Sequence, residues 1–210
     1  MDIKAARAYY VAHSGDERYK YHSSEIAQMI DEFHAGDDAV RAVIWEVFAA
    51  FALDGDAGEE YMTKNFFANH QPPEEIYARF VAVVAAGTSP QRMALERILG
   101  GSRTRLSAAD RQTLTELFVA DPVEHFALAG NLVQAEPRGP AWDAYLSALA
   151  RIQDPRVLAD GFEAAYLAMR EGDYFAAFAG RPPELVDAVA ERLPPSGGAG
   201  DRLKAAVRTA

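Results

Sequence analysis

Tyrosine and histidine residues cluster near the start of the chain. Four of the nine tyrosines and two of the five histidines lie between positions 9 and 22. The set comprises Tyr9, Tyr10, His13, Tyr19, Tyr21 and His22. Hydroxyl and imidazole groups beside apolar ring faces suit a pocket for an aromatic or anionic ligand. The alternative is that these rings form the edge of the core, with their polar tips in water.

Acidic residues concentrate between positions 25 and 60. That stretch holds ten Asp or Glu residues and one base, Arg41, so it carries nearly all of the net charge of −10. The interaction candidates within it are Glu25, Asp31, Glu32, Asp54, Asp56, Glu59 and Glu60. An acidic surface would steer a basic protein partner, whereas binding to nucleic-acid phosphates requires a basic surface. The alternative is that these acids are solvated helix faces and N-terminal helix charges.

Two short patterns resemble metal sites only in part. Asp31 and His34 have the i, i+3 spacing of ligand pairs in helical bundles, but those sites require a second such pair and further glutamates. Residues 54–60 are acidic like a calcium loop. Glycine is fifth rather than sixth there, and the twelfth position is Asn65 instead of a bidentate Glu. We therefore predict neither a metal nor a cofactor.

No motif predicts a catalytic residue. The segment GGSRTR, residues 100–105, precedes a helix that Ser107 and Asp110 would cap. Its amides and arginines suit a phosphate, but a glycine helix end followed by a solvated basic turn explains the same residues. The chain has no cysteine and no Gly-x-Ser-x-Gly elbow. Tertiary structure can still assemble a catalytic triad that spacing does not reveal.

The most apolar stretch of the chain is DDAVRAVIWEVFAAFAL, residues 37–53. From position 39 onward it contains only two charged residues, Arg41 and Glu46. A helix that is apolar around most of its circumference must be covered by other helices. This stretch is therefore the predicted central helix of an all-helical core, and Asp37 is its predicted N-terminal cap.

Other helices follow from three-four apolar spacing and from capping residues. They are predicted over residues 2–13, 22–35, 56–69, 74–86, 90–99, 108–120, 122–134, 142–152, 155–170, 174–178 and 183–193. The helix starts at Pro90, Pro122 and Pro155 are 32 and 33 residues apart, which resembles generic helical-hairpin arrays. Tetratricopeptide and ankyrin consensus residues are missing, and proline-capped helices in any bundle can produce similar spacings. No alternating β-branched run predicts a strand.

The predicted fold is an all-α, multi-helical bundle of roughly ten helices with no sheet. An N-terminal bundle over 1–87 grades into an α-solenoid-like stack of hairpins over 89–193, forming a single domain over 1–193. Residues 194–200, rich in proline and glycine, predict a linker. Residues 201–210 predict a short helix or a tail.

We expect a non-enzymatic protein-interaction module of the adaptor, inhibitor or immunity type, with an acidic surface for a basic protein. The alternative is a small-molecule-binding helical protein or enzyme that uses the Tyr/His pocket of residues 9–22. The sequence shows no signal peptide, no cysteine and no apolar run of ~18 residues. These features favour a cytoplasmic protein without a membrane partner, and we expect no nucleic-acid partner either. The excess of arginine over lysine, with abundant alanine, suggests a bacterial source.

Overall fold

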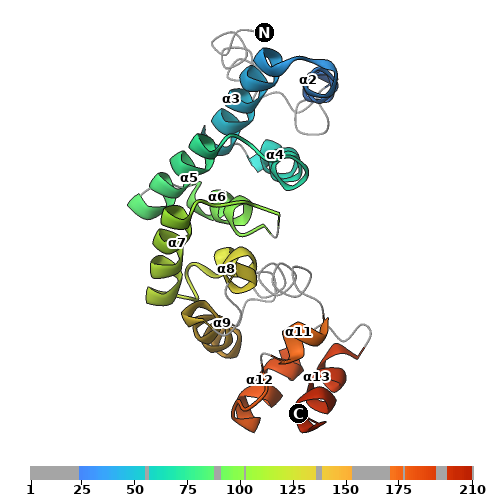
Figure 1. Cartoon of the computed structure of the whole chain (residues 1–210), viewed down its shortest axis with the longest axis vertical. Helices are drawn as coiled ribbons and strands as arrows, with labels where there is room; N and C mark the ends of the chain where they lie inside the picture. Colours follow the sequence, from blue (N-terminus) through green and yellow to red (C-terminus); the bar gives the residue numbers. More distant parts are fainter. Residues whose placement is uncertain are drawn as a thin grey trace. The chain divides into compact units, whose positions relative to one another are not determined.

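The computed structural model describes residues 24–54, 57–87, 91–101, 103–135, 139–152, 171–176, 178–192 and 198–209. Their regular structure consists of eleven α-helices and one short 3-10 helix, with no strand in these ranges (Figure 1). The prediction of an all-α fold is confirmed. The chain forms two compact units, residues 1–98 and 99–210.

The first unit contains α2 to α6. The bounds are α2 Ser24–Ala35, α3 Asp38–Asp54, α4 Ala57–Asn69, α5 Glu74–Ala86 and α6 Arg92–Leu99. Helix α3 contacts α2, α4 and α5. It is the helix predicted over 37–53. Its neighbours bury most of its apolar side chains between Ile44 and Ala52, whereas Val40 near its start stays exposed.

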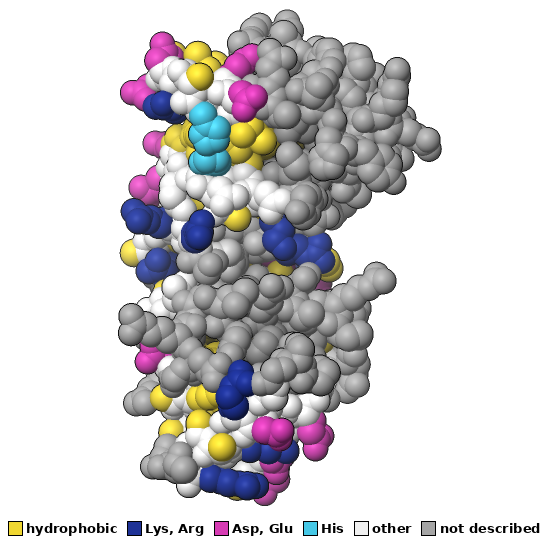
Figure 2. Space-filling model, turned by 90° about the vertical axis from the view of Figure 1, so that its right-hand side faces the viewer, with side chains coloured by type: hydrophobic (Ala, Val, Ile, Leu, Met, Phe, Trp, Pro, Cys, Tyr) yellow, Lys and Arg dark blue, Asp and Glu magenta, His cyan; other side chains and the backbone are white. Residues whose placement is uncertain are grey.

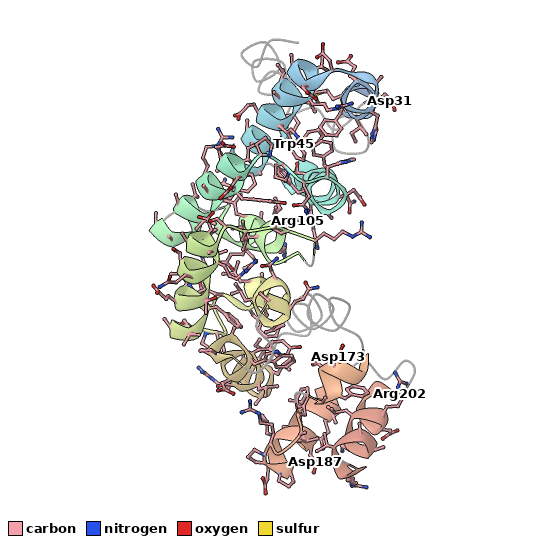
Figure 3. The ribbon with its side chains drawn as sticks, in the orientation of Figure 1. Asp31, Trp45, Arg105, Asp173, Asp187 and Arg202 are labelled. Carbon is pink, nitrogen blue, oxygen red and sulfur yellow. The ribbon has the colours of Figure 1, made fainter. Side chains whose placement is uncertain are left out.

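An aromatic layer fills the space between α2, α3 and α4. Phe48 of α3 and Phe66 of α4 are buried and stack with ring centroids 3.8 Å apart. Trp45 packs against Phe66 at 4.8 Å, and Phe33 of α2 meets the Phe66 ring edge-on at 5.0 Å. Figure 3 shows Trp45 between α3 and α4. Burial of large rings dominates the energetics of such a core.

Helix α5 has the bounds predicted from the sequence. Ile76, Tyr77, Phe80, Val81 and Val84 are its buried side. Gly87 ends the helix in the left-handed conformation, with φ of 69°, and its N–H donates to the Val84 carbonyl. Glycine adopts this conformation without steric cost, so it commonly ends helices.

The second unit contains helices α7 to α13. The bounds are α7 Ala108–Ala120, η2 Phe126–Leu128, α8 Ala129–Ala135, α9 Pro140–Arg151, α11 Glu171–Ala176, α12 Pro183–Arg192 and α13 Ala199–Thr209. Helix α9 contacts α7, α8 and α12, while α13 contacts α11 and α12. Aromatic residues again form the core, with Trp142, Tyr145, Tyr174 and Phe178 almost fully buried.

The predicted helix over 122–134 is wrong at its start. The His125 N–H donates to the Asp121 carbonyl, so Asp121 and Pro122 open a single helical turn. The chain then tightens to the 3-10 helix η2 before α8 begins at Ala129. This arrangement buries both Phe126 and Leu128. Pro122 therefore does not begin a continuous α-helix, as the proline spacing had suggested. The hairpin stack stays a prediction.

The C-terminal helix α13 docks on the second unit. Leu203 is fully buried, and Lys204 pairs with Asp187 of α12 at 3.2 Å. The helix begins at Ala199, two residues before the predicted segment 201–210. The single domain over 1–193 and the linker over 194–200 stay predictions.

Candidate functional site

Acidic side chains converge where α2 turns into α3. We name residues 31–41 the α2–α3 corner. Asp31, Asp37 and Asp38 are exposed there and Glu32 is half-buried. Figure 3 shows Asp31 on the outer side of α2. A protein that approaches the corner therefore meets several carboxylates that are already in contact with water.

Asp37 has a structural role at this corner as well. One of its carboxylate oxygens accepts hydrogen bonds from the N–H groups of Ala39 and Val40, both at 3.0 Å. These bonds satisfy free amides at the start of α3, so the predicted helix cap is confirmed. The negative charge is therefore held in place at the positive end of the helix.

Arg41 is the one base among residues 31–41, and its guanidinium group is engaged. Nη1 lies 3.2 Å from the Asp38 carboxylate, and Nε donates to the Phe33 carbonyl at 3.2 Å. The Asp38 side chain is fully exposed, so this ion pair contributes little to stability. Its main consequence is geometric, because Arg41 ties α3 to the last turn of α2.

The turn itself is tight. The Gly36 N–H donates to the Glu32 carbonyl at 2.7 Å, which ends α2. A side-chain carbon at Gly36 would lie 2.6 Å from a Val40 methyl group and 2.7 Å from the Glu32 carbonyl oxygen. Among the described residues, Val40 is one of three large apolar side chains that are exposed, at 37 %. The corner therefore presents an apolar side chain among acids.

Two histidines meet beside the corner, and we call them the histidine pair. His34 lies in the last turn of α2, and His70 follows the last residue of α4. Their ring centroids are 5.1 Å apart at an interplanar angle of 62°. His34 is exposed, whereas His70 is half-buried against Phe33 and Phe66. Figure 2 shows histidine side chains on the surface beside hydrophobic ones.

The environment of His70 favours its neutral form. Burial lowers the pKa of His70 below its usual 6.5, and the neighbouring charge of His34 lowers it further. Both effects disfavour the imidazolium ion, the first because burial removes hydration and the second because like charges repel. Both causes keep the His70 imidazole mainly uncharged at neutral pH.

The sequence did not predict the histidine pair. It placed His34 in an Asp-x-x-His pattern but gave no pattern for His70. The two residues meet only because separate helices pack together. Among the residues that the structure describes, no group of three or more His, Cys, Asp or Glu side chains could hold a metal ion. The signal that could have suggested the pair is that both histidines occupy helix C-terminal ends.

Most predicted site residues lie outside the described residues. These are the whole Tyr/His cluster, Tyr9, Tyr10, His13, Tyr19, Tyr21 and His22, together with Asp56. Of the other acids, only Asp31 and Glu32 have described side chains. Glu25, Asp54, Glu59 and Glu60 are placed in α2, α3 and α4 by their backbone alone. The Tyr/His pocket therefore stays a prediction.

The loop before α7 is organised by capping and by one buried amide. Ser107 accepts a hydrogen bond from the Asp110 N–H at 3.1 Å, so the predicted capping pair is confirmed. The Asn131 side-chain amide donates to the carbonyls of Gly101 and Thr104, at 3.2 and 2.6 Å. These contacts hold the loop against α8 and at the start of α7.

Comparison with known proteins found no relative of this chain. No family model, no curated protein and no solved structure matches the chain. Among the helices that the structure describes, none has the length and apolar character needed to cross a membrane.

Proposed function

We propose that this protein is a non-enzymatic interaction module whose α2–α3 corner binds a basic protein. The observation that carries the proposal is the exposure of Asp31, Asp37 and Asp38 around the partly exposed Val40. Exposed carboxylates steer a basic partner, and a central apolar side chain supplies contact area that can exclude water. Such a role fits the adaptor, inhibitor or immunity class, acting in the cytoplasm of a bacterial cell.

The corner is suited to binding because it is already ordered in the free chain. Asp37 is fixed by its two amide contacts, and Arg41 holds α3 against α2. Binding therefore requires little additional loss of conformational freedom, which improves affinity for a given contact area.

The test compares two double charge reversals with the same change in net charge. Asp31→Lys/Asp38→Lys changes the corner, and Glu116→Lys/Glu191→Lys changes exposed acids of the second unit. Each protein is used to capture partners from the native host, and association of a captured partner is then followed at several salt concentrations. We expect the corner variant to lose the partner and the control variant to keep it. The wild type and the control variant should associate with the partner faster at low salt. A partner retained equally by both variants would contradict the proposal.

A further inference from the structure

The histidine pair has the ring separation expected for two ligands on one ion. A zinc–nitrogen bond is ~2.0–2.1 Å long, and a ring centroid lies about 1 Å beyond its nitrogen, so two imidazoles on one tetrahedral ion have centroids roughly 5 Å apart. The centroids of His34 and His70 are 5.1 Å apart.

Both histidines lie at helix C-termini, which carry a partial negative charge. The last carbonyls of a helix lack intrahelical partners and carry a partial negative charge. His34 is in the last turn of α2, and the His70 N–H closes the last turn of α4 on the Phe66 carbonyl at 3.0 Å. The C-terminus of α4 and the exposed Asp31, one turn before His34, therefore favour a cation at this point, while in α2 the Arg41 guanidinium already binds the Phe33 carbonyl.

The aromatic layer limits the movement of His70. Phe33 lies 4.9 Å and Phe66 4.8 Å from His70, centroid to centroid. A ligand that is held by packing loses less conformational freedom when a metal binds.

We propose that His34 and His70 together bind one divalent transition-metal ion of the zinc, copper and nickel class. Each contributes one ring nitrogen, and water fills the remaining positions, because no third described ligand joins the pair. Imidazole nitrogen selects this class over the hard cations magnesium and calcium, which prefer oxygen ligands. The bound ion would connect the C-terminal ends of α2 and α4. This site goes beyond the proposed docking of a basic protein, although it shares His34 and Asp31 with the α2–α3 corner.

The experiment titrates the full-length protein with Zn²⁺ by calorimetry and measures thermal unfolding with and without the ion. His34→Gln and His70→Gln each remove one ligand while retaining a polar side chain. His125→Gln is the matched control, because His125 lies in the second unit. His13 and His22 are present in every variant, so any binding by them is a constant background.

We expect one zinc ion per chain and a rise in the melting temperature, because the ion binds the native state. Loss of a supporting group outside the coordination shell already costs ~10–100-fold in metal affinity, so loss of a ligand should cost at least about tenfold. His125→Gln should bind as the wild type does, and Mg²⁺ should not bind. Equal zinc affinity in the wild type and in a folded His34→Gln variant, which alters an exposed residue, would overturn the proposal.

Discussion

The rings of Phe48 and Phe66 stack nearly parallel, with centroids 3.8 Å apart and planes inclined by 9°. Phe48 is fully buried on α3, and its partner belongs to α4, so the contact joins two helices of the first unit. Removal of the Phe48 ring would leave Phe66 facing a cavity. The first prediction follows from this contact.

Phe48→Ala should lower the free energy of unfolding by ~3–5 kcal/mol, which is the usual cost of a buried Phe truncation. Chemical denaturation followed by circular dichroism measures the change. Val40→Ala on the same helix is the control, and because Val40 is partly exposed we expect a change within ~0.5 kcal/mol. A loss under ~1 kcal/mol for Phe48→Ala would show that α3 is not the centre of the core.

Substitutions at Asp37 should separate its cap from its charge. Asp37→Ala removes the acceptor for the Ala39 and Val40 amides and should cost ~0.5–2 kcal/mol of stability. Asp37→Asn keeps an equally good capping side chain, so its stability should stay close to that of the wild type. Thermal unfolding of both variants tests this difference, and an equal loss in both would mean that the charge, rather than the cap, stabilises α3.

The histidine pair predicts a dependence of stability on pH in the absence of metal. The folded state lowers the pKa of His70, first through burial and second through the charge of His34, so the unfolded state binds the proton more readily. This contribution to stability is therefore complete above the ordinary pKa of 6.5 and is lost as the pH falls through the lowered folded pKa. Urea midpoints at about pH 5 and pH 7.5 should differ less in His70→Gln than in the wild type.

His34→Gln tests the smaller of the two causes. It removes the neighbouring charge but leaves His70 half-buried, so it should abolish only part of the pH effect. A pH dependence that is identical in the wild type and in both variants would show that other groups are responsible.

Tyr145 and Tyr174 form the corresponding buried pair of the second unit. Their hydroxyl oxygens are 3.0 Å apart, and both side chains are fully buried. Tyr145→Phe should cost ~0.5–1.5 kcal/mol at neutral pH, the usual net value of one hydrogen bond. Tyr174→Phe and the double variant complete a double-mutant cycle, which should show coupling of the two hydroxyls. Strict additivity of the two single changes would argue against a shared bond.

Alkaline unfolding gives a second test of the tyrosine pair. Burial raises the pKa of Tyr145 well above its usual 10.0, although its hydrogen bond with Tyr174 opposes this shift. The folded state thus favours the neutral phenol, and this stability is present below pH 10.0 and is lost as the pH rises beyond it. Above about pH 10 the wild type should lose stability more steeply than Tyr145→Phe.

The sequence alone predicted the local elements. The predicted ranges 74–86 and 108–120 are the observed α5 and α7, and Asp37 and Ser107 cap their helices as expected. Apolar periodicity and capping depend on residues within a few positions of one another, so the sequence determines them directly. It also located the acidic stretch, because charge is a property of composition.

Tertiary structure decided which residues meet. His34 and His70 share a site because α2 and α4 both pack on α3, and Tyr145 pairs with a residue 29 positions away. Long-range packing also decided the chain after Pro122, where the burial of Phe126 and Leu128 accompanies a 3-10 turn in place of a continuous helix. Helix periodicity gives the face that must be buried, but not the partner that covers it, because any complementary apolar face satisfies the same pattern.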